Sequence, residues 1–227
     1  MVSFSIIPEI TGFNSSNVIT FFLQKYLFFL IKKSIFLLKI YTLKNIVSQN
    51  KPFFKFLIKF LLFYIVLTFI YKVFLFQYNV EKNEIDFFTE QVANQTFEFM
   101  KIFSNEVRTA DNLREPSVNF YYKERLISRI IEGCNAISVM ILFASFVFAF
   151  SSHWKKTILY ITLGIFIIHV LNVVRIGLLT FALYYCPSQK ELLHDIVFPL
   201  FIYGVVFVLW ILWVTKFSGY GKTTSAK

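Results

Sequence analysis

Four long apolar runs constrain this chain more than any other feature of its sequence. They cover residues 60–76, 136–150, 158–185 and 196–215. A helix needs about 20 apolar residues to cross the hydrocarbon core of a bilayer, and the runs approach or exceed that length. We therefore expect an all-α fold, a polytopic membrane bundle of about four transmembrane helices.

The composition also indicates that much of the chain lies in a membrane. Hydrophobic residues make up 57% of the chain, and 31 of its 227 residues are Phe. A water-soluble domain of this size would have difficulty burying so much apolar surface. The third run is long enough that its helix must tilt or bend, and Gly177 offers a position for a bend.

Basic residues set the expected orientation. Lysines gather before the first run, between the second and third runs, and after the fourth run. They are Lys44, Lys51, Lys55, Lys59, Lys155, Lys156, Lys216, Lys222 and Lys227. Loops rich in lysine stay on the cytoplasmic side, so the connections 77–133 and 186–195 face outward. Basic flanks beside an anionic lipid bilayer account for the net charge of +10, and no nucleic-acid partner is needed.

The N-terminal residues 1–42 stand apart from the membrane domain, which we assign to 43–227. The stretch 18–41 is apolar but contains Lys25, Lys32 and Lys33. This pattern suits either an interfacial helix or a fifth span. Because it lacks a small-residue cleavage site, we do not expect its removal as a signal peptide.

The outer segment 77–133 contains one helical pattern. Apolar side chains recur at helical spacing at Phe88, Val92, Phe99 and Phe103. We expect an amphipathic helix there, either lying on the membrane surface or packing against the bundle. The stretch 104–124 is polar and contains Pro116, so we expect a loop.

Three reactive side chains lie near the expected outer surface. Cys134 precedes the second run, Arg175 lies within the third, and His194 comes just before the fourth. An arginine within a span costs about 2.5–3.5 kcal/mol on insertion scales, so it usually faces protein or water. Snorkelling to the headgroups is the alternative. Asn172, one turn before Arg175, shares its face.

A thiol, a guanidinium and an imidazole at one depth suit acyl transfer. A thiol is only a few per cent ionised near neutral pH unless a cation lies close to it. Arg175 carries a permanent charge and several donors, which stabilise a thiolate or an oxyanion. His194 is suited to moving a proton, and Asp195 or Glu191 is placed to orient it.

Other interpretations of the same residues stay open. Cys134 and Cys186 could form a disulfide in an oxidising compartment. His194 and Glu191 offer two metal ligands one turn apart, but no H-E-x-x-H run accompanies them. The polar residues could also hold helices together in a non-enzymatic scaffold or assembly factor for envelope protein export. A transporter is less favoured, because the polar groups cluster at one surface.

Three short runs carry a resemblance to a known family. They are I-E-G-C-N-A-I-S at 131–138, N-V-V-R-I at 172–176 and H-D-I-V-F-P at 194–199. Their order and spacing resemble those of the exosortases, over about residues 45–216. The runs D-F-F-T at 86–89 and V-A at 92–93 are similar to the exosortase F subgroup of the Bacteroidetes.

The resemblance implies a cysteine protease or transpeptidase of the cell inner membrane that needs no cofactor. Its partners would be exported proteins with a C-terminal sorting signal, made of a short motif, a membrane helix and a basic cluster, which it cleaves on the periplasmic side. Cys134 would be the nucleophile, His194 the general acid or base, and Arg175 the stabilising cation. Asn172 and Asp195 would support them.

Overall fold

The computed structural model describes residues 32–33, 48–79, 82–151 and 153–218. Its contacts divide the chain into two units, 1–54 and 55–227. Residues 32 and 33 are helical, whereas the rest of the stretch expected to form an interfacial helix or fifth span, 18–41, lies outside the described residues. The second unit holds the candidate site.

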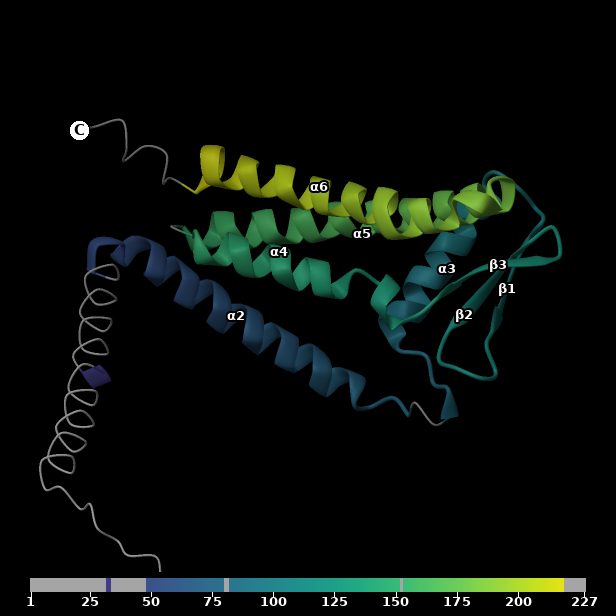
Figure 1. Cartoon of the computed structure of the whole chain (residues 1–227), viewed down its shortest axis with the longest axis horizontal. Coiled ribbons are helices and arrows are strands. Elements are labelled where there is room, and N and C mark those ends of the chain that lie inside the picture. Colours follow the sequence, from purple (N-terminus) through teal and green to yellow (C-terminus); the bar gives the residue numbers. More distant parts are fainter. Residues whose placement is uncertain (1–31, 34–47, 80–81, 152, 219–227) are drawn as a thin grey trace, which may run out of the picture. The chain divides into compact units, whose positions relative to one another are not determined.

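The membrane-spanning part consists of helices, as the apolar runs predict (Figure 1). The helices are α2 (Lys51–Leu75), α4 (Ile137–Ala149), α5 (Trp154–Tyr185) and α6 (Phe198–Leu212), and π-helical turns extend α6 on both sides to give a helix of 26 residues from Leu192 to Phe217. Among the described residues, three helices, α2, α5 and the extended α6, are long and apolar enough to cross a membrane. A polytopic helical membrane fold is therefore confirmed.

The second expected span differs from the other three in length. Helix α4 has 13 residues and is about 20 Å long, which is shorter than a hydrocarbon core of about 30 Å. Its apolar residues pack against α5 and α6 around the buried side chains of Phe143, Ile168 and Val206. The N-terminal end of α4 therefore lies within the bundle, and the turn that contains Cys134 precedes it.

Helix α5 is the longest helix among the described residues. Its 32 residues span about 48 Å, well over the thickness of the hydrocarbon core. The helix is uninterrupted at Gly177, where a Cβ atom would lie 2.6 Å from the Phe99 ring. Gly177 thus permits the close approach of helix α3 (Phe87–Lys101).

Helix α3 is the amphipathic helix expected in the outer segment. Asp86 is its N-cap residue, and the carboxylate accepts hydrogen bonds from the backbone N–H groups of Phe88 and Thr89. Its buried stripe consists of Thr89, Val92, Ala93, Thr96 and Met100. Because Val92, Ala93 and Met100 share a hydrophobic cluster with Val173 and Ile176 of α5, α3 is a packing element, and Phe88 and Phe103 lie outside the stripe.

The expectation of a loop at 104–124 is wrong. Three antiparallel strands, β1 (Val107–Asp111), β2 (Val118–Tyr122) and β3 (Arg125–Ile130), form a sheet in the order β1-β2-β3. Val118, Phe120 and Tyr122 alternate as buried residues and pack on α3 and α5. A sheet forms here because α3 and α5 together offer an apolar surface that covers one of its faces.

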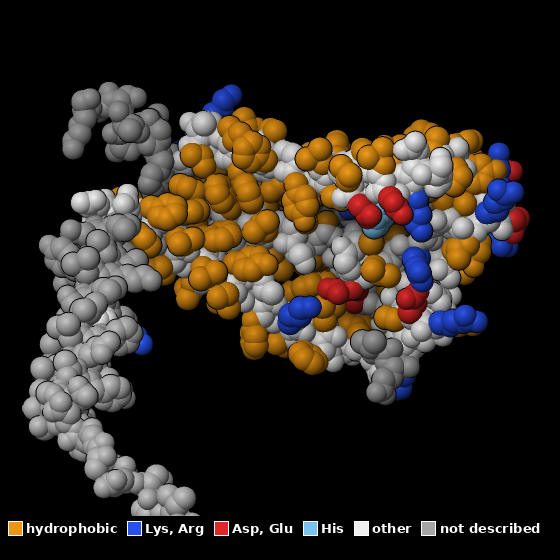
Figure 2. Space-filling model, in the orientation of Figure 1, with side chains coloured by type: hydrophobic (Ala, Val, Ile, Leu, Met, Phe, Trp, Pro, Cys, Tyr) orange, Lys and Arg blue, Asp and Glu red, His pale blue; other side chains and the backbone are white. Residues whose placement is uncertain are grey.

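The two ends of the second unit differ in the kind of side chain that they expose. Figure 2 shows hydrophobic side chains covering the membrane helices, while charged side chains gather toward the end that carries α3 and the sheet. Large apolar residues such as Leu62, Phe69 and Leu159 are about two-thirds exposed or more. Such a surface is suited to contact with lipid.

Candidate active site

One cavity of about 730 Å³ brings together all three reactive side chains singled out from the sequence. Cys134 reaches it from the turn before α4, Arg175 from α5, and His194 from the turn of helix that precedes α6. Ligand pockets usually measure about 300–1,000 Å³. The cavity is therefore large enough for a segment of a substrate.

The local backbone fixes the position of Cys134. A single turn of 3₁₀ helix, Glu132–Cys134, is closed by a 2.8 Å hydrogen bond from the Cys134 N–H to the Ile131 carbonyl. Ala136 then adopts a left-handed conformation with φ of 61°, which turns the chain into α4. The thiol is half-buried at this turn.

The two cysteines do not form the disulfide that was considered above. Cys134 and Cys186 are both free, and Cys186 is exposed. Cys186 does not line the cavity. Of the two thiols, only that of Cys134 lines the same cavity as Arg175 and His194.

A network of hydrogen bonds holds the turn that contains Cys134 in place. The Asn135 carboxamide donates hydrogen bonds to the hydroxyl oxygens of Tyr71 (2.9 Å) and Thr89 (3.3 Å) and accepts one from the Ile137 N–H (3.0 Å). The Tyr71 hydroxyl in turn donates to Glu132 at 3.1 Å. These contacts tie the cysteine turn to α2 and α3. Sequence reasoning missed Tyr71 and Thr89, because nothing in their local sequence signals a partner more than forty residues away.

Asn172 connects the cysteine turn to the arginine. Its Nδ2 donates to the Cys134 carbonyl oxygen at 2.8 Å, and its Oδ1 accepts from Arg175 Nη1 at 3.2 Å. The side chain of Asn172 is completely buried. The expectation that Asn172 and Arg175 share a face of the helix is confirmed.

Arg175 lies in the C-terminal third of α5. It follows Trp154, the first residue of α5, by about 30 Å along the helix axis, which equals the thickness of a hydrocarbon core. Its Nε is buried without a hydrogen-bond partner among the described residues. Nη1 donates to Asn172, and the Arg175 side chain lines the cavity.

Of the two acids expected to orient His194, Asp195 makes the contact. Nδ1 of His194 lies 2.6 Å from Oδ1 of Asp195, and both side chains are more than half exposed. With Nδ1 donating to the carboxylate, Nε2 is left to exchange a proton. The described part of the chain contains no cluster of three or more His, Cys, Asp or Glu side chains that could hold a metal ion.

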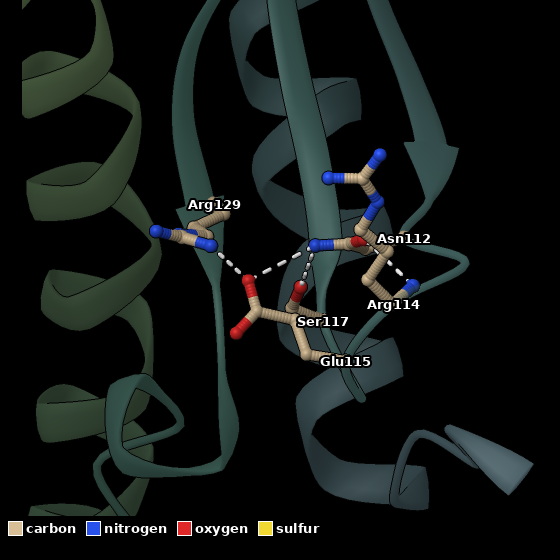
Figure 3. A network of polar contacts seen from close by, with 5 residues as sticks. All are labelled: Asn112, Arg114, Glu115, Ser117 and Arg129. Atoms are coloured by element: carbon tan, nitrogen blue, oxygen red, sulfur yellow. Dashed lines mark hydrogen bonds and ion pairs between the residues drawn. The ribbon is translucent and has the colours of Figure 1, made fainter.

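A second polar network joins the connection between β1 and β2 to strand β3 (Figure 3), and four of its residues line the cavity: Asn112, Arg114, Glu115 and Arg129. Glu115 accepts hydrogen bonds from Arg129 of β3 and from Asn112 Nδ2, the latter at 3.0 Å. Asn112 also donates to the Ser117 hydroxyl at 3.1 Å and accepts from the Arg114 N–H at 3.0 Å. The network orders the connection between β1 and β2. It was not foreseen, since the segment was expected to be a loop.

Comparison with known proteins supports the sequence resemblance. A family model described as transmembrane exosortase matches residues 23–214, a range that contains Cys134, Arg175 and His194. No curated protein and no solved structure matches the chain. Because the match covers most of the 227 residues, the chain is a multi-pass membrane protein that belongs to the transmembrane exosortase family.

Proposed function

We propose that this protein is a membrane-embedded cysteine peptidase or transpeptidase that removes C-terminal sorting signals from exported proteins. One observation carries the proposal: Cys134, Arg175 and His194 come from three separate segments and line a single cavity. The family match is consistent with this chemistry. Helix packing alone would not require the thiol, the cation and the imidazole to meet at a cavity.

The first half of the reaction forms a thioester. His194 Nε2 takes the proton of the Cys134 thiol, and the Sγ thiolate attacks the carbonyl carbon of the scissile peptide bond. Arg175 stabilises the thiolate and then the negative charge on the carbonyl oxygen. His194 returns its proton to the amide nitrogen, the C–N bond breaks, and the tail of the substrate leaves as an amine.

The second half resolves the thioester. An amine acceptor, or water, attacks the thioester carbonyl while His194 accepts its proton. The C–S bond then breaks, and Sγ leaves as a thiolate beside Arg175. An amine gives transpeptidation, whereas water gives hydrolysis. The protein contributes only side chains of the cavity to these steps, and we expect no cofactor.

The charge distribution supports a periplasmic position for the cavity. Lys155 and Lys156 lie at the first turn of α5, and Lys216 lies at the far end of the last helix. The positive-inside rule places these residues in the cytoplasm. Arg175 would then lie at the outer boundary of the inner membrane. Exported proteins would meet the cavity from that side.

The test uses an exported protein whose C-terminus carries a short motif, a membrane helix and a basic cluster. Co-expression with the wild-type chain should remove the tail, and Cys134→Ala should abolish its removal. Cys186→Ala is the matched control, because this exposed thiol lies outside the cavity, and it should process normally. A hydroxylamine-sensitive adduct on Cys134 would identify the thioester. Normal tail removal by Cys134→Ala would falsify the proposal.

The same experiment separates the enzyme from a scaffold. Protein abundance and thermal unfolding are measured for Cys134→Ala, Arg175→Ala and His194→Ala in parallel with processing. An enzyme loses processing while the folded protein persists. If the three substitutions only lower the amount of folded protein, the side chains serve assembly.

A further inference from the structure

The free edge of strand β3 borders the cavity that contains Cys134. Five consecutive residues of the strand, 126–130, line this cavity. Three of them, Ser128, Arg129 and Ile130, pair regularly with β2. Successive side chains there point to opposite faces, so a cavity on one face would touch only every second one of the three. The cavity therefore follows the edge of the strand. Because the sheet order is β1-β2-β3, this edge has no partner strand among the described residues.

The hydrogen bonds of β2 reveal which backbone groups reach that edge. The Asn112 N–H donates to the Ser117 carbonyl at 2.9 Å, and the Lys123 N–H donates to the Glu106 carbonyl at 3.0 Å. Odd-numbered residues of β2 therefore bond to the β1 side. Bonding alternates along a strand with two neighbours, so even-numbered residues of β2 bond to β3.

The alternation leaves the backbone of Arg129 facing the cavity. Ser128 and Ile130 are opposite Phe120 and Val118, and they form the backbone bonds to β2. Arg129 lies between them, so its N–H and C=O point away from β2. This donor and this acceptor are available to an incoming backbone.

The rest of the cavity wall suits a peptide in extended form. Ile176, Leu179 and Leu183 present one apolar face of α5 to it. A 2.8 Å hydrogen bond between the hydroxyls of Ser128 and Thr180 holds β3 against the same helix. Cys134 follows the end of β3 by four residues. The strand edge therefore leads directly to the thiol.

We propose that the substrate binds as an additional β-strand on the free edge of β3, with its scissile carbonyl beside Cys134. This inference rests on the proposed function and specifies how the same cavity recognises its substrate. Main-chain hydrogen bonds to Arg129 supply affinity without regard to sequence, as in other cases of strand addition. Every second side chain of the peptide lies against the apolar face of α5.

The first test needs no natural substrate. Cys134→Ala protein in nanodiscs is incubated with a library of random decapeptides, acetylated at the N-terminus and amidated at the C-terminus, and the retained peptides are sequenced. The best binder is then made in versions that each carry one N-methylated residue. Methylation at alternate residues should weaken binding about tenfold or more, since it removes donors to β3, and methylation at the intervening residues should have little effect. Failure to retain any peptide, or a scan without alternation, overturns the proposal.

A matched pair of variants tests the strand itself. Arg129→Ala and Arg129→Pro both lose the side-chain contact to Glu115, but only proline also removes the N–H at the free edge. Proline is tolerated at sheet edges where the N–H is not bonded within the sheet. We expect Arg129→Pro to bind the selected peptide about tenfold more weakly than Arg129→Ala. Equal affinities contradict the inference, and if Arg129→Pro does not fold, the methylation scan decides alone.

The outcome is distinguishable from failure of the proposed function. Peptide binding to Cys134→Ala uses no thiol chemistry. If binding shows alternating sensitivity to N-methylation but the wild-type protein forms no thioester, the proposed cysteine peptidase activity is refuted. The proposed binding of peptide at the edge of β3 is then retained. Thioester formation without alternation would keep the enzyme and refute strand addition.

Discussion

The Asn172 side chain holds the backbone carbonyl of Cys134 across 2.8 Å and so joins α5 to the turn that carries the thiol. The same carboxamide accepts a hydrogen bond from Arg175. Both groups of one amide are therefore used, and the residue is completely buried. Asn172 is a positioning residue that fixes the spacing between the nucleophile and the cation.

Replacement of Asn172 should impair processing without removing any reacting group. Asn172→Ala leaves the Cys134 carbonyl unpaired in a buried setting, which costs about 1–3 kcal/mol, or about 5- to 150-fold in rate if the turn is displaced. Asn172→Asp keeps the acceptor for Arg175 but loses the donor to Cys134, so it should fall between wild type and alanine. The rate of tail removal is the readout. Wild-type rates in both variants would contradict a positioning role.

Arg175 should control the reactivity of the Cys134 thiol even when no substrate is present. Arg175→Gln removes a cation from the cavity that contains Cys134, and alkylation of Cys134 by iodoacetamide should slow about tenfold or more, because the sulfur reacts in a negatively charged form that a cation stabilises. Arg175→Lys keeps a charge but loses the planar fork of donors and should be intermediate. Cys186 is an internal control in the same sample, since it is exposed. Its alkylation rate should not change, and parallel changes at both cysteines would indicate a general effect on folding.

Asp195 should contribute less than Asn172. Its contact with His194 is more than half exposed on both sides, and solvent weakens such pairs to about 1 kcal/mol or less. Asp195→Asn should therefore lower the rate of tail removal by less than about tenfold. His194→Ala, measured beside it, should abolish tail removal because no other imidazole lines the cavity within the described residues. A loss in Asp195→Asn as large as that in His194→Ala would show that the carboxylate is indispensable.

The membrane helices could be predicted from the sequence, whereas the sheet could not. Hydropathy reports directly on the solvent of a segment, so the long runs that became α5 and the last helix were evident. Strand β2 offers only five residues of alternation, and its apolar side becomes meaningful only once α3 and α5 provide a surface to cover it. The same limit applies to Tyr71 and Glu115. Their hydrogen bonds depend on segments that meet only after packing.

The three reactive residues of the cavity, Cys134, Arg175 and His194, could also be identified from the sequence. A guanidinium inside an apolar run is costly unless it meets protein or water, so Arg175 is conspicuous in a way that Asn112 is not. The resemblance to exosortases then grouped Arg175 with Cys134 and His194. What the sequence did not contain was the strand edge beside them, because an edge is defined by the absence of a neighbour in three dimensions.

Close helix packing around Phe143 provides a prediction about stability. A Cβ atom on Gly164 of α5 would lie 2.3 Å from two ring carbons of Phe143 on α4, and the ring is completely buried. Gly164→Ala should therefore force the helices apart and reduce stability by about 1–3 kcal/mol. The measurement is thermal unfolding in detergent micelles.

Gly204→Ala is the matched control for Gly164→Ala. It also adds one methyl group within a membrane helix, but no heavy atom lies within 4 Å of the added carbon. Its unfolding temperature should stay the same or rise slightly, because alanine favours helix over glycine. Phe143→Leu, which removes the clashing ring carbons, should restore part of the stability lost in Gly164→Ala. Equal unfolding temperatures for Gly164→Ala and Gly204→Ala would mean that α4 and α5 do not pack as closely as the structure places them.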